Sequence, residues 1–259
     1  MLQPPIVLCF SGHDPCGGAG VQADIESIRS HQCHAVSIIT ALTDQDTVNV
    51  KQIYPQAPEQ IRRQAETLFA DMPIAAIKIG LIGHADTANV LADILLQHPR
   101  IPVVLDPVLA AGGGANLAGQ DLLQVLRARL LPLTTVLTPN STEARRLTGL
   151  QDLPACGQAL RDQGVKWVLI TGAHETTEQV DNHLFMPDGT METYHWQRLP
   201  GEFHGSGCTL ASAIAALMAL GLDAQAAAHE AQDFTWQALE AAYRTGAGQF
   251  NPQRLFWVS

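Results

Sequence analysis

Short apolar runs alternate with amphipathic segments along almost the whole chain. The runs are rich in β-branched residues and too short for helices, so they predict buried strands at residues 6–10, 35–42, 74–79, 103–105, 135–137 and 167–171. Apolar residues at helical spacing predict helices from residue 21 onward and at residues 59–69, 86–96, 120–130 and 142–148. This alternation favours an α/β fold with a doubly wound, mainly parallel sheet and helices on both faces.

The last third of the chain departs from this alternation. Residues 183–186 and 191–196 flank Pro187-Asp188-Gly189, which predicts a β-hairpin as the main antiparallel part of the sheet. The apolar segment 210–222 is too short to span a bilayer comfortably and predicts a helix buried on all sides. A second long helix is expected to follow it. Because no repeat or linker interrupts the chain, we predict one domain over residues 1–259.

Composition and charge narrow the class of protein. The chain is 46% hydrophobic and 15% charged, which is ordinary for a globular protein. A formal net charge of -10 argues against nucleic acid or an anionic membrane as the main partner, but leaves room for a phosphorylated small molecule. Five cysteines without a Cys-x-x-Cys pair indicate reduced thiols rather than disulfides or structural zinc. No signal peptide is evident, so we expect a cytoplasmic protein.

The most informative motif runs from residue 204 to residue 209 and reads His-Gly-Ser-Gly-Cys-Thr. Glycines let the backbone approach a ligand, and a helix that starts there adds unpaired N–H donors and partial positive charge. Gly205, Ser206 and Gly207 are therefore candidates for an anion cradle, most often for phosphate. The same field favours the thiolate of Cys208, which would make it a proton acceptor. The alternative for this thiol is a buried apolar packing role.

Oxygen-bearing side chains follow two of the predicted strands. Open parallel sheets bind ligands beyond the carboxyl ends of their strands. Asn140 and Glu143 lie one helical turn apart at one such end, and Asp106 follows another. Carboxylate and amide oxygens are suitable ligands for magnesium. Alternatively, Asn140 and Glu143 form a helix capping box and Asp106 stabilises a turn, and these roles can coexist.

Two loops near the first strands predict a substrate wall. Residues 17–20 are rich in glycine but match neither a dinucleotide nor a Walker fingerprint. With His13, Asp14 and Asp24 nearby, this loop is either a close-fitting wall for a substrate or a structural turn. Gln45 follows the second strand, and its carboxamide could read the edge of an aminopyrimidine, although many loop amides are simply solvated.

Taken in order, these motifs resemble the hydroxymethylpyrimidine/phosphomethylpyrimidine kinases of the ribokinase-like superfamily. The resemblance begins with residues 10–24 and covers nearly the entire chain, through residues 38–42, 78–81, 106–108, 138–143 and 205–209. It implies a ribokinase-like fold with little or no lid. It also implies an enzyme of thiamine biosynthesis that uses ATP and Mg2+ to phosphorylate an aminopyrimidine alcohol, hydroxymethylpyrimidine, and then its monophosphate.

The resemblance assigns roles to individual residues. The pyrimidine pocket would be lined by Gln45, Gly12, Ala19, Leu81 and Val108. Residues 205–207 would form the anion hole, and Cys208 would accept a proton where many members of the superfamily carry aspartate. Asn140 and Glu143 would hold magnesium, mostly through water. Because relatives are commonly dimers, a homodimer is expected.

Two departures from the family reduce the expected positive charge at the phosphates. Thr171 stands where the family often carries lysine, and residues 109–114 replace a basic, serine-containing loop. Lys78, His13 and His204 are the candidates to supply the missing charge.

Three other functions compete with the kinase. Pyridoxal kinase is a close rival, because related enzymes with a cysteine at this position accept the similar pyridoxal ring. A binding protein that has lost turnover is a second alternative. A nicotinamide-dependent oxidoreductase fits the fold but lacks the required glycine fingerprint. Gln45 favours the aminopyrimidine.

Overall fold

The strands form one nine-stranded sheet in the order β3-β2-β1-β4-β5-β6-β7-β8-β9. The computed structural model describes residues 3–110, 114 and 117–258. The strands are β1 (Ile6–His13), β2 (His34–Gln45), β3 (Val50–Pro55), β4 (Ile74–Ile79), β5 (Val103–Leu105), β6 (Val136–Leu137), β7 (Trp167–Ile170), β8 (Gln179–Phe185) and β9 (Met191–Gln197). Strands β2, β1, β4, β5, β6 and β7 are parallel, whereas β3 at one edge and β8 near the other run in the opposite direction. The edge strand β9 pairs antiparallel with β8 and so runs in the direction of the parallel strands. The doubly wound, mainly parallel sheet is confirmed.

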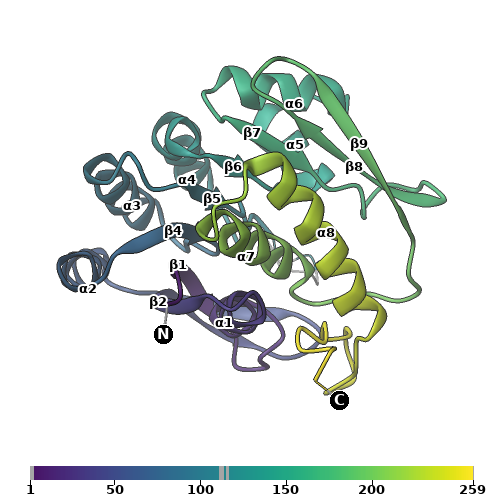
Figure 1. Ribbon diagram of the computed structural model, residues 1–259, viewed down its shortest axis with the longest axis horizontal. Helices are drawn as coiled ribbons and strands as arrows, with labels where there is room; N and C mark the ends of the chain where they lie inside the picture. The colour runs from purple at the N-terminus through teal and green to yellow at the C-terminus, as the bar shows by residue number, and fades with distance from the viewer. Residues whose placement is uncertain (1–2, 111–113, 115–116, 259) are drawn as a thin grey trace.

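Helices cover both faces of this sheet (Figure 1). They are α1 (Gly20–Ser30), α2 (Pro58–Asp71), α3 (Ala85–Gln97), α4 (Gln120–Val125), α5 (Ser141–Thr148), α6 (Leu153–Asp162), α7 (Ser206–Ala219) and α8 (Ala224–Glu240), and a π-helical stretch (Leu126–Leu130) extends α4. One apolar core packs the helices α2, α3, α4, α5 and α6 against one face of the sheet. A second core packs α1, α7 and α8 against the other face. Among the described residues, no helix is long and apolar enough to cross a membrane.

Two elements were not predicted. Strand β3 is an edge strand whose residues are all exposed or half-buried, so no apolar alternation marks it, and it adds an antiparallel pair beyond the predicted hairpin. Helix α6 contains Pro154 and Gly157, which normally interrupt helices. Proline is tolerated in the first turn of a helix, and Gly157 packs where a Cβ would lie 2.3 Å from the ring of Phe185.

The connections bring several loops to one edge of the sheet. Helix α1 follows β1 and α5 follows β6, so their N-termini lie at the carboxyl ends of those strands. Helix α7 begins there as well, because its N-cap Gly205 contacts the loop after β1 and Gly207 contacts Asp106 after β5. Helix α7 is buried from Thr209 to Leu217, as its apolar sequence predicts.

Candidate active site

The N-terminus of α7 is a tight glycine turn, as the sequence predicts. Gly205 is the N-cap, with a left-handed φ of 81° that favours glycine. A Cβ on Gly205 would lie 2.0 Å from the carbonyl oxygen of Gly18, so the turn also packs directly on the glycine loop. The N–H groups of a first helical turn have no partner within the helix. Residues 205–208, which include the predicted residues 205–207, therefore present N–H donors where the loops converge.

Asp106 and Cys208 lie together at this turn. A Cβ on Gly207 would lie 3.5 Å from Asp106 Oδ2, and the side chain of Cys208 is a hydrogen-bond partner of Asp106. Burial raises the pKa of Cys208 to about 12, although the charge of Lys78 opposes the shift. The surroundings of Cys208 therefore favour the thiol, whereas the partial positive charge at the N-terminus of α7 acts in the opposite direction.

Asn140 and Glu143 form the capping box predicted as the alternative to a metal site. Asn140 Oδ1 accepts from Glu143 N at 2.9 Å, and Glu143 Oε2 accepts from Asn140 N at 3.0 Å. Glu143 Oε1 also accepts from Leu109 N at 3.1 Å. Burial and the charge of Asp106 raise the pKa of Glu143 to about 8. Burial likewise raises the pKa of Asp106 to about 6.

These two carboxyl groups fit a divalent cation, because each is buried and the charge of Asp106 disfavours ionisation of Glu143. Hard oxygen donors of this kind are the ligands that magnesium uses, usually together with several waters. Within residues 3–110, 114 and 117–258, no group of three or more His, Cys, Asp or Glu side chains is arranged around a common metal position. The donors therefore suit a cation held partly through water and Asn140.

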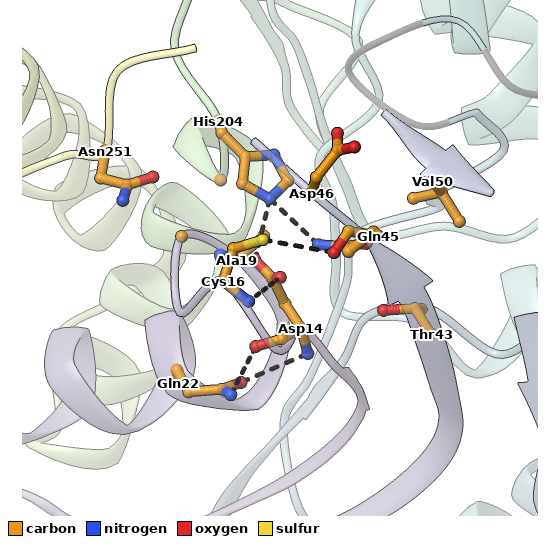
Figure 2. Close-up of polar contacts among 12 residues, drawn as sticks. Asp14, Cys16, Ala19, Gln22, Thr43, Gln45, Asp46, Val50, His204 and Asn251 are labelled. Atoms are coloured by element: carbon orange, nitrogen blue, oxygen red, sulfur yellow. Dashed lines mark hydrogen bonds and ion pairs between the residues drawn. The ribbon is translucent and has the colours of Figure 1, made fainter. Parts of the chain in front are cut away.

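Asp14 organises the glycine loop after β1. Its carboxylate accepts from Cys16 N and Ala19 N at 2.8 Å each, and from His204 Nε2 at 2.9 Å, as Figure 2 shows. Burial opposes ionisation, but hydrogen bonds from His204 and from the backbone of Cys16 hold the pKa of Asp14 at about 2. The ionised carboxylate therefore joins the glycine loop to the residue that precedes the α7 turn.

Gln45 lies at the end of β2 and faces the same histidine (Figure 2). Its Nε2 is 3.3 Å from His204 Nε2, and the thiol of Cys16 donates to its backbone oxygen at 3.4 Å. Gln45 is only half-buried, so part of its carboxamide remains accessible. Because His204 Nε2 donates to Asp14, it cannot also accept from the Gln45 amide, so Gln45 and the turn predicted to bind phosphate are neighbours of one His204 ring rather than bonded through it.

The other residues predicted to line the substrate pocket differ in where they lie. Gly12 and Leu81 are in contact, because a Cβ on Gly12 would lie 2.7 Å from Leu81 Cδ2. Ala19 lies on the Asp14 loop, and Val108 follows Asp106 after β5 and is half-buried. Asp24 is different, since it is completely buried beneath the loop.

Asp24 forms an internal ion pair rather than a substrate wall. Lys78 Nζ lies 2.7 Å from Asp24 Oδ1 and 3.1 Å from Ser11 Oγ, and Ser212 Oγ donates to Asp24 Oδ1 at 2.7 Å. The side chains of Asp24 and Lys78 are both 0% exposed. Burial alone would lower the pKa of Lys78, yet the charge of Asp24 leaves it raised. Lys78 therefore cannot contact a phosphate as the sequence suggested.

Thr171 lies beside Asn140 at the end of β7. Its N–H donates to Pro139 O at 3.0 Å, and its carbonyl accepts from Ser141 N at 2.9 Å. Thr171 therefore occupies the strand end where the resemblance predicts a lysine, but its side chain carries no positive charge. The altered loop at 109–114 falls partly on residues 111–113, which lie outside the described residues.

Sequence reasoning missed Arg254. This side chain is 1% exposed and its Nε donates to Thr209 Oγ1, in the first turns of α7, at 2.8 Å. One arginine in a polar C-terminal segment carries no spacing or periodicity that would single it out.

Comparison with known proteins places this site in a family. The family model for phosphomethylpyrimidine kinase matches residues 14–253. A hydroxymethylpyrimidine/phosphomethylpyrimidine kinase of Streptomyces coelicolor is 35% identical, with 95% of this chain and 93% of the relative covered. The enzyme of that name from Synechococcus elongatus is 38% identical, with 96% of each chain covered.

Solved structures of kinases superpose on this chain over most of its length. An ADP complex of Bacillus subtilis pyridoxal kinase superposes with a TM-score of 0.92 at 25% identity, over 99% of this chain and 100% of that one. Phosphomethylpyrimidine kinase from Clostridium difficile gives 0.79 at 28% identity, over 92% and 100%. The ribokinase-like fold is thereby confirmed. With this fold, and with the family model matching nearly its whole length, the chain belongs to the phosphomethylpyrimidine kinase family.

Proposed function

We propose that this protein is a kinase that phosphorylates hydroxymethylpyrimidine and then its monophosphate. The observation that carries the proposal is the position of His204 beside both Gln45 and the Gly205 turn. The ring of His204 lies 3.3 Å from the Gln45 carboxamide and directly precedes the Gly205 turn. A pyrimidine read by Gln45 would therefore sit beside the N–H donors at the start of α7.

ATP supplies the phosphoryl group, and magnesium would neutralise charge on its phosphate oxygens. Asp106, Glu143 and Asn140 are the residues that would hold the cation, mostly through water. The backbone N–H groups of residues 205–207 would donate to the oxygens of the transferring group. Because the Gly205 turn fixes these donors before the reaction, they need no reorganisation as charge develops.

Cys208 and Asp106 form a route for the substrate proton. As the hydroxymethyl oxygen bonds to phosphorus, its O–H bond breaks and the proton passes to Cys208 sulfur. In the same step Cys208 passes its own S–H proton to the carboxylate of Asp106, its hydrogen-bond partner. The phosphorus–oxygen bond to the ADP leaving group breaks, so atoms and charge balance. In the second transfer the acceptor is a phosphate oxygen, which has little need of a proton acceptor.

The proposal includes a homodimer. Leu42, Val48 and Tyr54 on the β2–β3 ribbon are 41%, 56% and 52% exposed, so the edge of the sheet offers apolar surface to a second copy. Light scattering of the purified protein tests this part, and a monomeric mass at micromolar concentration would contradict it.

Product analysis tests the activity. The protein is incubated with Mg-ATP and separately with hydroxymethylpyrimidine, its monophosphate and pyridoxal. We expect the first two to be phosphorylated, and we expect Gln45→Ala to raise KM for hydroxymethylpyrimidine. Faster turnover of pyridoxal would favour the pyridoxal kinase alternative, which the similarity to the Bacillus subtilis enzyme keeps open. No product from any substrate would favour a binding protein.

A further inference from the structure

Arg254 is buried where three segments of the candidate site meet. Its Nε donates to Thr209 Oγ1 at 2.8 Å, its Nη1 donates to Glu26 Oε2 at 2.9 Å, and its Nη2 donates to the carbonyl of Gly18. Only 1% of the residue is exposed. One guanidinium therefore binds α7, α1 and the glycine loop at the same time, a geometry that its rigid fork of donors allows and that lysine cannot reproduce.

Thr209 extends this contact to the start of α7. Its hydroxyl accepts from Arg254 and donates to the carbonyl of Gly205 at 2.8 Å. A Cβ on Gly205 would lie 2.9 Å from Arg254 Nη2 and 2.0 Å from Gly18 O. The guanidinium therefore lies against the turn whose N–H groups form the candidate anion hole.

The backbone around Arg254 is held in place from two sides. Ser30 Oγ donates to Arg254 O at 2.8 Å, and Gln253 N donates to Ala238 O at 2.8 Å. Upstream, His204 N donates to Phe250 O at 2.8 Å, so the C-terminal segment also pairs with the loop that leads into the anion hole. The position of the guanidinium is thus set by α1 and α8.

The positive charge of Arg254 indicates a role beyond stabilising α7. A helix N-terminus already carries partial positive charge, so a cation there does not stabilise the helix. The partner carboxylate of Glu26 is 43% exposed, and water screens its charge. A positive potential at the start of α7 does favour the binding of a phosphoryl group. Thr171, which is uncharged, contributes no such potential.

We propose that Arg254 is a positioning residue for both phosphoryl transfers. It locks the Gly205 turn onto the Gly18 loop and adds positive potential behind the anion hole. This inference rests on the proposed kinase function. It differs from the role of Cys208, because the anion hole is used in both transfers whereas a proton acceptor is needed chiefly in the first.

Steady-state kinetics of Arg254→Gln tests the inference. We expect kcat to fall about tenfold to a hundredfold for both substrates, since misaligned donors stabilise the transition state less. We expect KM for hydroxymethylpyrimidine to change less than about threefold, because Gln45 is untouched. Arg129→Gln is the matched control: it removes a guanidinium that binds Asn89 and Asp93 on α3, and should keep full kcat.

Two further measurements separate positioning from folding. Thr209→Val removes the relay hydroxyl at nearly constant volume and should lower kcat in the same direction, even if the arginine variant is too unstable to purify. In Arg254→Ala, millimolar guanidinium should restore part of kcat, whereas methylammonium should not.

The outcomes distinguish this inference from the proposed function. Unchanged kcat in Arg254→Gln and Thr209→Val, with only a lower melting temperature, would overturn the positioning role while the kinase stands. An inactive wild-type protein would defeat both proposals together.

Discussion

In the proposed mechanism Cys208 and Asp106 act as a pair, because the thiol and the carboxylate meet at the first turn of α7. A thiol with a pKa of about 12 cannot accept a proton until it has released its own. In the proposed mechanism the neighbouring Asp106 carboxylate takes that proton while the sulfur accepts the proton of the substrate, so the net acceptor is Asp106. The proposal therefore assigns proton transfer to the two residues together.

The two transfers should respond differently to Cys208→Ala. We expect kcat for hydroxymethylpyrimidine to fall about a hundredfold, within the usual range for loss of general-base catalysis. The loss for the monophosphate should be much smaller, because its acceptor oxygen is already ionised. Separate rate measurements with each substrate check this, and equal losses in both steps would count against a proton-accepting role.

Gly205 should not tolerate a side chain. In Gly205→Ala the new Cβ would meet the backbone of Gly18 at 2.0 Å, so the turn must open and kcat should fall at least about tenfold. Gly221, after the other end of α7, also has a positive φ (98°), but no atom lies within 4 Å of its Cβ position. Gly221→Ala should therefore lose about 1 kcal/mol of stability and keep kcat. Similar kcat values for the two variants would refute the steric argument.

At the scale of elements, most helices and strands could be predicted because burial imposes a period on the sequence. Strand β4, for example, matches its predicted bounds of 74–79, since almost every one of its side chains faces a core. Strand β3 could not be found, because an exposed edge strand needs no apolar face. The capping box of α5 was visible as a spacing.

The site was predicted less completely than the fold. Motifs at strand ends indicated Gln45 and residues 205–208, which the fold brings to one edge. Contacts between distant segments could not be read from spacing. Asp24 therefore looked like a wall residue although it pairs with Lys78, and Arg254 was missed.

The buried carboxyl groups after β5 and at the start of α5 predict a pH-dependent effect of magnesium. Burial raises the pKa of Asp106 from 3.8 to about 6 and that of Glu143 from 4.5 to about 8. The native state thus binds more protons than the unfolded state between pH 3.8 and about 6 for Asp106, and between pH 4.5 and about 8 for Glu143. The free energy of unfolding therefore falls as pH rises through these two ranges. A cation needs the ionised groups, so its stabilising effect should grow over the same range.

Thermal unfolding with Mg2+ and with a chelator, at pH values from about 6 to about 8, measures this effect. The shift in melting temperature caused by Mg2+ should increase with pH in the wild type and should be nearly absent in Asp106→Asn. Asp93→Asn, which removes a carboxylate paired with arginines on α3, is the control and should behave like the wild type. A shift independent of pH would exclude these carboxylates as the cation site.

At the scale of the whole molecule, one internal cluster joins the elements that carry the site. Ser11 lies on β1, Asp24 on α1, Lys78 on β4 and Ser212 on α7. Ser212 is one helical turn after Cys208, so the cluster lies directly beneath the anion hole. A Cβ on Gly80 would lie 2.5 Å from Lys78 Nζ, so the ammonium group takes the space that a side chain at position 80 would need. The cluster therefore fixes how the two loops approach one another.

Removing one partner of this ion pair should be far worse than removing both charges. Lys78→Met leaves the Asp24 carboxylate buried without its cation, and we expect the free energy of unfolding to fall by about 3–5 kcal/mol. Lys78→Met combined with Asp24→Asn leaves no buried charge and should recover much of that loss, while KM for hydroxymethylpyrimidine stays close to the wild-type value. Urea denaturation and substrate kinetics of the two variants provide the measurements. A double variant as unstable as the single one would mean that packing dominates over charge, and a large rise in its KM would return Asp24 to the substrate wall.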